Sequence, residues 1–216
     1  MLIFFFCSFK MIKPPKVKEI ELESFYHKLN INHFSLPTFD SFTNAITGFY
    51  KLKRKGLIKK NILTIIDFNL SSNVKRMWII DLDRKVVLMN TYVAHGKNTG
   101  DEFATSFSNE NSSLKSSLGF YTTGEIYKGK HGISLKLDGL ERGINDKARE
   151  RGIVIHSAYY VSNEFIKNNK RLGRSQGCPA VPIEVSSQII NMIKNKSCLF
   201  IYHSTKNSDK ESDSIS

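Results

Sequence analysis

The sequence predicts a mainly β domain with peripheral helices, in the α+β class. From residue 62 onward, short runs rich in β-branched and aromatic residues recur, and such runs are typical of strands. Glycine and asparagine separate these runs, as turn residues do. Two helical patterns come before the strands instead of alternating with them. This order favours a sandwich or partial barrel over repeated βαβ units.

The first 16 residues are interpreted as an apolar stub followed by a linker. Residues 1–9 are almost all apolar, yet they lack a basic start and a small-residue cleavage site, and they are too short to span a bilayer. We interpret them as an incomplete export signal. Lipidation at Cys7 is disfavoured because bulky phenylalanines precede it. Pro14 and Pro15 mark the linker.

Residues 17–56 are predicted to form a helical appendage with two helices. The first covers about residues 17–29 and has loosely spaced apolar residues. The second is clearer, with Asp40 or Ser41 to cap it and Gly56 to end it. Its apolar residues recur at helical spacing, in the stripe Phe42, Ala45, Ile46, Phe49 and Tyr50. Such a stripe is typical of core packing, and we assign it no chemistry.

Residues 57–203 are predicted to form one catalytic domain, and the polar tail 204–216 is expected to be disordered. A helix follows Pro182, whose fixed φ suits a helix start. The segment 105–117 is rich in serine and threonine and long for a loop, so we interpret it as the wall of a cleft. Strands are expected over residues 62–68, 77–82, 86–94, 118–121, 133–137, 153–155 and 198–202.

The chain has a formal net charge of +12 at pH 7. A strongly basic chain implies an anionic partner, for which we consider nucleic acid, acidic lipid and a carboxylate-rich cell-wall polymer. The lysines are dispersed, and no RNP, zinc-finger or helix-turn-helix signature occurs, so we expect no nucleic-acid partner. For most individual lysines, a solvated surface that only aids solubility stays an alternative.

The three cysteines Cys7, Cys178 and Cys198 include no C-x-x-C pair. Their spacing supports neither a zinc ribbon nor a thioredoxin-type site, and the odd number argues against a disulfide framework. Cys198 lies in an apolar, strand-like run and is expected to be a buried core thiol. Cys178 is therefore the thiol of chemical interest.

Cys178 lies in a turn of glycine and small polar residues, which leaves its sulfur uncrowded, and His156 ends an apolar run upstream. A thiol nucleophile and its base often come from separate elements that folding brings together. An ordinary tight turn and a histidine at a strand end would explain the same two residues equally well. The flanking sequence decides between these interpretations.

Several segments together resemble the L,D-transpeptidase catalytic domain family, which has the YkuD-like fold: residues 117–120, 155–157 and 175–178. Others look like the murein L,D-transpeptidase branch of that family: residues 63–68, 93–96 and 172–175. The resemblance covers about residues 57–202. It implies a β-sandwich enzyme of the cell envelope that acts as a monomer on peptidoglycan stem peptides, through a cysteine acyl-enzyme and without a metal or cofactor.

The family pattern falls on this chain position by position. It places the base on His156, the serine on Ser175, the glycine on Gly177 and the nucleophile on Cys178. Eighteen residues separate His156 from Ser175, one more than the family's usual range. Gln176 occupies the slot of a second histidine, which leaves His156 as the sole base of the motif.

The resemblance also implies how these residues work together. An imidazole within hydrogen-bond reach takes the thiol proton and stabilises the thiolate. The backbone carbonyl of Ser157 would orient His156, and the backbone N–H groups of Gly177 and Cys178 would stabilise the oxyanion. The donor stem loses its terminal D-alanine. The acyl group then passes to an amine, giving a crosslink or an attached protein, or to water, giving L,D-carboxypeptidase activity.

Four residues are candidates for substrate binding: Arg174, Ser175, Gln176 and His95. Arg174 could bind a carboxylate through its planar fork, or it could cap its own loop. His95 could line the cleft, but we favour a turn histidine with a structural hydrogen bond.

Two other function classes stay open. A cysteine peptidase or amidase of another specificity could use the same Cys178 and His156 pair on a peptide or glutamine amide. A catalytically inactive cell-wall-binding domain could keep the fold, and Gln176 is the residue that leaves this alternative open.

Overall fold

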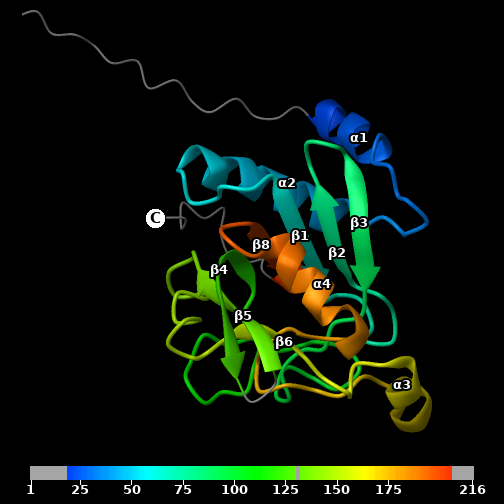
Figure 1. Ribbon diagram of the computed structural model, residues 1–216, viewed down its shortest axis with the longest axis vertical. Coiled ribbons are helices and arrows are strands. Elements are labelled where there is room, and N and C mark those ends of the chain that lie inside the picture. The colour runs from blue at the N-terminus through cyan, green and yellow to red at the C-terminus, as the bar shows by residue number, and fades with distance from the viewer. Residues whose placement is uncertain (1–18, 130–131, 206–216) are drawn as a thin grey trace, which may run out of the picture.

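The computed structural model describes residues 19–129 and 132–205, which fold around a sheet of eight strands (Figure 1). In space the strands follow the order β3-β2-β1-β8-β4-β5-β6-β7. β1 pairs with β8 and β6 pairs with β7 in parallel, and the other neighbouring strands are antiparallel. The strands are β1 (Ile62–Asp67), β2 (Met77–Asp81), β3 (Val86–Thr91), β4 (Gly119–Gly129), β5 (Gly132–Gly139), β6 (Val154–Ser157), β7 (Ala180–Val181) and β8 (Cys198–Tyr202).

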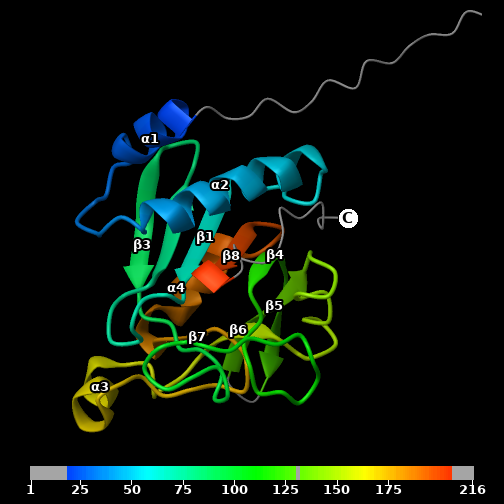
Figure 2. The same cartoon turned by 180° about the vertical axis from the view of Figure 1, so that it is seen from behind.

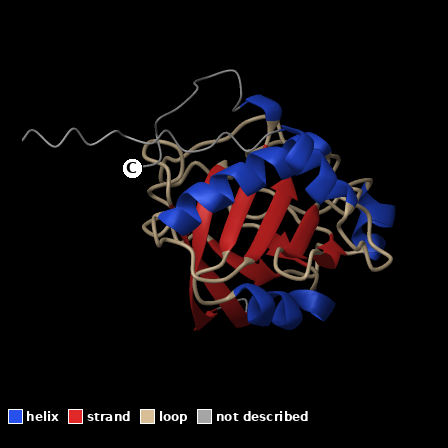
Figure 3. Ribbon diagram, turned by 90° about the horizontal axis from the view of Figure 1, so that it is seen from above, coloured by secondary structure: helices blue, strands red, loops and turns tan. Residues whose placement is uncertain are grey.

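Helices cover both faces of the sheet. α2 (Phe39–Arg54) and α4 (Ile183–Ile193) lie on opposite faces, as Figure 3 shows. α2 packs on β1 and β8, and Figure 2 views the molecule from the side that this helix covers. The two shorter helices, α1 (Glu19–His27) and α3 (Asn163–Asn169), lie at the margins of the molecule (Figure 1). The mainly β class with peripheral helices, two of them before the first strand, is confirmed.

Alternating side chains along the central strands fill two separate cores. Leu63 and Ile65 belong to the core under α2, whereas Ile66 and Ile201 belong to the core under α4. Successive strand residues point to opposite faces, so one unbroken apolar run contributes to both cores. Cys198, on the α2 side, is fully buried as predicted, and burial raises the pKa of its thiol.

α2 forms where the sequence predicts it, although its cap differs. The side chain of Thr38 accepts a hydrogen bond from the backbone N–H of Ser41 (3.3 Å), so Thr38 is the N-cap instead of Asp40 or Ser41. The apolar stripe is buried except for Tyr50, which is 41% exposed. Gly56 follows the helix with a φ of +74°, a left-handed conformation that glycine adopts easily.

The other predicted elements are present, although the bounds of most of them differ, and β3 ends at Thr91 instead of residue 94. β4 and β5 run further than expected because their outer parts are exposed and lack an apolar run. A register shift between Thr123 and Ile126 separates the buried and exposed halves of β4. α4 begins directly after Pro182. The sequence analysis missed α3 and β7, which are both short.

Some predictions fall on residues that the structure does not describe. The apolar stub with Cys7 and residues 206–216 of the tail lie outside the described residues. The boundaries of the predicted appendage (17–56) and catalytic domain (57–203) stay predictions. Within the described ranges, no helix combines the length and apolar character needed to cross a membrane.

Gly48 tests the packing of α2 on the sheet. A Cβ at Gly48 would lie 1.9 Å from Cζ of Phe120, whose buried ring stacks on Phe200 at 4.2 Å. We predict that Gly48→Ala lowers the free energy of unfolding by roughly 1–3 kcal/mol, although alanine has the higher helix propensity. Urea denaturation followed by circular dichroism measures this change.

Thr47→Ala is the matched control, because Thr47 is the exposed neighbour of Gly48 in the same helix. This substitution should leave the free energy of unfolding unchanged or raise it slightly. Wild-type stability in Gly48→Ala would contradict a tight helix crossing at this position.

Candidate active site

One hydroxyl holds the turn that carries the predicted nucleophile. Ser175 Oγ accepts a hydrogen bond from the backbone N–H of Gly177 (3.0 Å) and donates one to the carbonyl oxygen of Cys178 (2.6 Å). Gly177 has a φ of +124°, and a Cβ there would lie 2.8 Å from the carbonyl oxygen of Lys115. A side chain at Gly177 would therefore strain the backbone and clash with the neighbouring loop.

The pairing of β7 with β6 brings the cysteine turn to the predicted base. Ala180 pairs with His156, and Val181 pairs with Ser157. Cys178 lies two residues before Ala180 and is therefore beside β6. A cavity of about 550 Å³ forms here. Five residues of the predicted site line this cavity: His156, Arg174, Ser175, Gln176 and Cys178.

His156 is nearly buried and is held in one tautomer. Its Nδ1 lies 2.9 Å from the carbonyl oxygen of Ser157. Because a carbonyl oxygen can only accept, Nδ1 carries the hydrogen of the neutral ring and Nε2 carries the lone pair. A general base needs such a lone pair. The contact is the one that the resemblance implies, while the catalytic roles of His156 and Ser157 stay predictions.

Two neighbouring loops fix the backbone of the cysteine turn. Ser116 Oγ accepts a hydrogen bond from the N–H of Gly96 (3.0 Å) and donates one to the carbonyl oxygen of Gly177 (3.0 Å). The N–H of Ser175 donates to the carbonyl oxygen of His95 (2.9 Å). Segments that are far apart in the sequence thus meet at this turn, and backbone and hydroxyl hydrogen bonds join them.

The polar segment 105–117 contributes Ser112 and Leu114 to the cavity wall, which agrees with the expected cleft wall. Arg151 anchors this segment, for example through a hydrogen bond from Nη2 to the carbonyl oxygen of Lys115 (2.6 Å). Arg151 also lines the cavity, although the sequence analysis did not single it out.

His95 lies outside the cavity lining, and it is 1% exposed. Its Nδ1 accepts a hydrogen bond from Nη2 of Arg76 (2.8 Å), and its Nε2 donates to the carbonyl oxygen of Gly100 (3.2 Å). Both contacts exist together only in the neutral ring, because a guanidinium only donates and a carbonyl only accepts. Burial and the charge of Arg76 lower the pKa of His95 to about 4. These contacts are structural hydrogen bonds of the kind that the sequence analysis favours for His95, and its contact with substrate stays a prediction.

Arg76 is fully buried and was also missed by the sequence analysis. Its Nε and Nη2 donate to the carbonyl oxygen of Val93 (3.1 and 3.0 Å), and its Nη1 donates to that of Leu70 (2.8 Å). The guanidinium carbon lies 4.8 Å from the ring centroid of Phe68. Burial lowers the pKa of Arg76 to about 9, against the opposing effect of Asp67. No sequence pattern distinguishes this arginine from a surface residue.

Arg174 makes the contacts of a loop cap. Its Nη1 donates to Oδ1 of Asp101 (2.7 Å) and to the carbonyl oxygen of Gly100 (3.1 Å). Arg174 also lines the cavity, so its contact with substrate stays a prediction. Gln176 is exposed at the same cavity.

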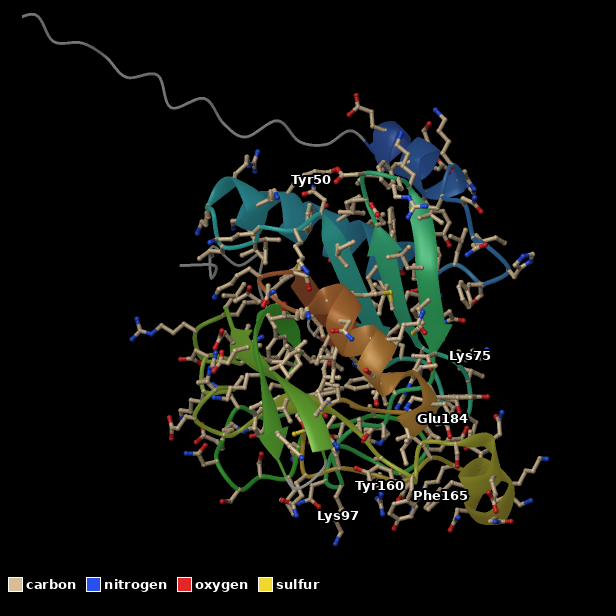
Figure 4. The ribbon with its side chains drawn as sticks, viewed as in Figure 1. Tyr50, Lys75, Lys97, Tyr160, Phe165 and Glu184 are labelled. Atoms are coloured by element: carbon tan, nitrogen blue, oxygen red, sulfur yellow. The ribbon has the colours of Figure 1, made fainter. Side chains whose placement is uncertain are left out.

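Tyr160 is another cavity residue that the sequence analysis did not indicate. A Cβ at Gly173 would come within 2.5 Å of the Tyr160 ring, so the two residues are in close contact. Burial, and then the negative charge of a Cys178 thiolate, raises the pKa of Tyr160 to about 12. Figure 4 shows Tyr160 near Phe165 of α3, and their ring centroids are 6.4 Å apart.

The L,D-transpeptidase catalytic domain is the family whose model matches this sequence, over residues 35–202. The chain belongs to this family. The match covers α2, all eight described strands and the predicted residues of the cavity. No curated protein matches this L,D-transpeptidase domain.

Solved structures that resemble this L,D-transpeptidase domain include the L,D-transpeptidase from Mycobacterium smegmatis, with 11% identity, a TM-score of 0.42, and coverage of 66% of this chain and 59% of that chain. The helical cell shape determining protein Pgp2 from Campylobacter jejuni has 13% identity and a TM-score of 0.44, and the match covers 71% of this chain and 55% of that chain. L,D-transpeptidase 1 from Mycobacterium tuberculosis has 8% identity and a TM-score of 0.38, and the match covers 66% of this chain and 62% of that chain. The transpeptidase domain thus spans less than two thirds of each of these chains. Within its described residues, no three His, Cys, Asp or Glu side chains are grouped to hold a metal ion.

Protonation of His95 should couple pH to the stability of the transpeptidase domain. Its pKa is about 4 in the folded chain, against 6.5 as the ordinary value. As the pH falls, the unfolded chain binds this proton first. The free energy of unfolding should therefore decrease between pH 6.5 and pH 4, by up to about 3 kcal/mol from this residue. Urea denaturation at several pH values across this window measures the decrease.

His95→Gln is the matched variant, because an amide can accept from Arg76 and donate to Gly100 without titrating. The stability of His95→Gln should depend less on pH than that of the wild type across the same window. Parallel pH profiles for the two proteins would contradict the prediction.

Proposed function

We propose that this domain is a peptidoglycan-modifying cysteine L,D-transpeptidase, with Cys178 as nucleophile and His156 as base. The observation that supports this best is the cavity that both residues line, in which Nδ1 of His156 is held by the carbonyl of Ser157. A thiol and an imidazole in one cavity suit acyl transfer through a thioester. Membership of the L,D-transpeptidase family directs this chemistry to stem peptides.

The proposed reaction consists of two acyl transfers through Cys178. Nε2 of His156 takes the Sγ proton, and Sγ attacks the carbonyl carbon of the amide that precedes the terminal D-alanine. The C–N bond of this amide breaks, and D-alanine leaves as an amine with the proton from the imidazolium. An acceptor amine or water then attacks the thioester carbon, gives a proton to His156 and displaces the Sγ thiolate. An amine yields a crosslink or an attached protein, and water yields a carboxypeptidase product.

Backbone N–H groups of Gly177 and Cys178 are the proposed donors to the oxyanion. In the structure, the N–H of Gly177 is bonded to Ser175 Oγ. The oxyanion must therefore share this N–H or displace the hydroxyl, while Ser175 can keep its hydrogen bond to the carbonyl oxygen of Cys178. Ser175 thus controls the availability of one proposed oxyanion donor.

Arg174, Ser175 and Gln176 are the proposed substrate contacts, because all three line the cavity. The guanidinium of Arg174 is already paired with Asp101, so a substrate carboxylate would join or replace this ion pair. We also propose that the domain works in the cell envelope, where peptidoglycan lies. The formal charge of +12 suits an anionic wall polymer.

Incubation with disaccharide-tetrapeptides tests the proposed reaction. Mass spectrometry should show loss of D-alanine and crosslinked dimers, and Cys178→Ala should abolish both products. His156→Gln should lower the rate by about 10²–10⁴-fold, because the variant lacks the base. His203→Gln is the matched control, since His203 lies outside the cavity lining, and it should keep the wild-type rate.

Trapping by a carbapenem separates the remaining function classes. The proposal expects an adduct mass on Cys178 that is absent from Cys178→Ala. The absence of both turnover and adduct would favour a non-catalytic wall-binding domain. Cleavage of a peptide or glutamine amide, without any change in tetrapeptides, would identify a cysteine peptidase or amidase of another specificity.

A further inference from the structure

Arg151 lies beside the cysteine turn. It is half-buried, it directly precedes Gly152, and it lines the cavity together with Cys178. Its Nη2 is 3.4 Å from the position that a Cβ of Gly177 would occupy, and Gly177 is the residue before the nucleophile. The guanidinium therefore lies beside the backbone of the cysteine turn, and it interacts electrostatically with a negative charge on Cys178 in this partly desolvated site.

The hydrogen bonds of Arg151 all go to neutral oxygens. Nη1 donates to the carbonyl of Ser108 (2.8 Å) and to the hydroxyl of Ser117, and Nη2 donates to the carbonyl of Lys115 (2.6 Å) and to the hydroxyl of Ser113 (3.3 Å). In the described part of the chain, no carboxylate lies within 4.0 Å of this guanidinium. These four bonds fix the group in place without neutralising its charge.

Arg149, two residues earlier, has the opposite environment. Its Nε pairs with Asp138 (2.6 Å) and its Nη1 pairs with Glu125 (2.7 Å). These hydrogen bonds raise the pKa of Arg149. Burial lowers the pKa of Arg151, and negative charge on Tyr121, Cys178 and Glu110 opposes this effect, although Glu110 is itself paired with Lys147 (3.1 Å) and the burial of Tyr121 keeps that phenol neutral. A partly desolvated cation without a carboxylate in direct contact is costly. Its position in the cavity therefore indicates that a negative charge forms next to it.

The nucleophile needs such a positive charge. Sγ of Cys178 donates to the carbonyl oxygen of Gly152 at 3.7 Å, and a contact of this kind favours the neutral thiol over the thiolate. Among the other titratable or charged residues of the lining, Tyr127 and Tyr160 add no positive charge, and Arg174 is paired with Asp101. His156 becomes positive only after it takes a proton.

We propose that Arg151 supplies a standing positive charge that stabilises the Cys178 thiolate and, later, the oxyanion of the tetrahedral intermediate. This role rests on the proposed function, and it adds a cation that is present before the reaction begins. The segment 105–117 positions the guanidinium, so the charge does not depend on bound substrate.

The pH dependence of alkylation by iodoacetamide tests the role of Arg151 without peptidoglycan. The reagent forms a bond between Sγ and its methylene carbon and releases iodide, and the thiolate is the reactive form. Peptide mass spectrometry assigns the adduct to Cys178. In Arg151→Met, the midpoint of the pH–rate profile should move upward by about one pH unit, and alkylation below the midpoint should be about tenfold slower.

Two variants separate the charge of Arg151 from its anchoring contacts. Arg151→Lys keeps the charge but loses the planar fork, and it should keep a midpoint close to that of the wild type. Arg149→Met removes a cation that carboxylates already neutralise, and it should not move the midpoint either. Equal shifts in Arg151→Met and Arg151→Lys, or no shift in Arg151→Met, would overturn the proposal. Should Arg151→Met fail to fold by circular dichroism, Arg151→Gln takes its place in the same comparison.

The failure of this inference is distinguishable from failure of the proposed function. An unshifted alkylation profile in Arg151→Met, together with tetrapeptide turnover by the wild type, rejects only the role of Arg151. A shifted profile without any tetrapeptide turnover by the wild type rejects the transpeptidase reaction and keeps the role of Arg151 in activating the thiol.

Discussion

The parallel pairing of β7 with β6 is the constraint on which the candidate site depends. β7 has only two residues, yet their partners are His156 and Ser157, and Ala180 is also hydrogen-bonded to Ala94 on its other side. A slip of one residue would turn the side chains of the pair to the opposite faces. Cys178 would then leave the cavity. The position of Cys178 relative to His156 is thus set by backbone hydrogen bonds of the fold.

A buried polar layer supports this pairing from the side of the loop that follows β3. Arg76 binds the carbonyl of Val93 and the ring of His95, and the carbonyl of His95 binds the N–H of Ser175. Apolar packing alone does not fix loop backbones, because their polar groups need partners. A network in which every member has a partner holds the loop in one conformation, provided that His95 stays neutral.

The sequence predicts the centre of the fold better than its margins, for a physical reason. Strands such as β1 and β8 contribute side chains to both cores, so each is a continuous apolar run that the sequence makes easy to find. β7 has only two residues, which is too few to show the alternating pattern of a strand. Cys178 and His156 are found from the motif and its spacing. Arg76 and Arg151 resemble surface arginines in the sequence, and only the folded chain shows that the first is buried and the second lines the cavity.

The structure also explains how the chain accommodates Gln176 where the family pattern has a histidine. The turn is held by Ser175 Oγ on the inside and by Ser116 Oγ at the carbonyl of Gly177, while the residue at position 176 is exposed. The side chain of Gln176 therefore does not set the backbone of Cys178. Any consequence of this substitution must arise in the cavity, where Gln176 contributes a neutral amide in place of a titratable ring. The proposed reaction therefore has no titratable side chain at position 176, and its proposed base and nucleophile are His156 and Cys178 alone.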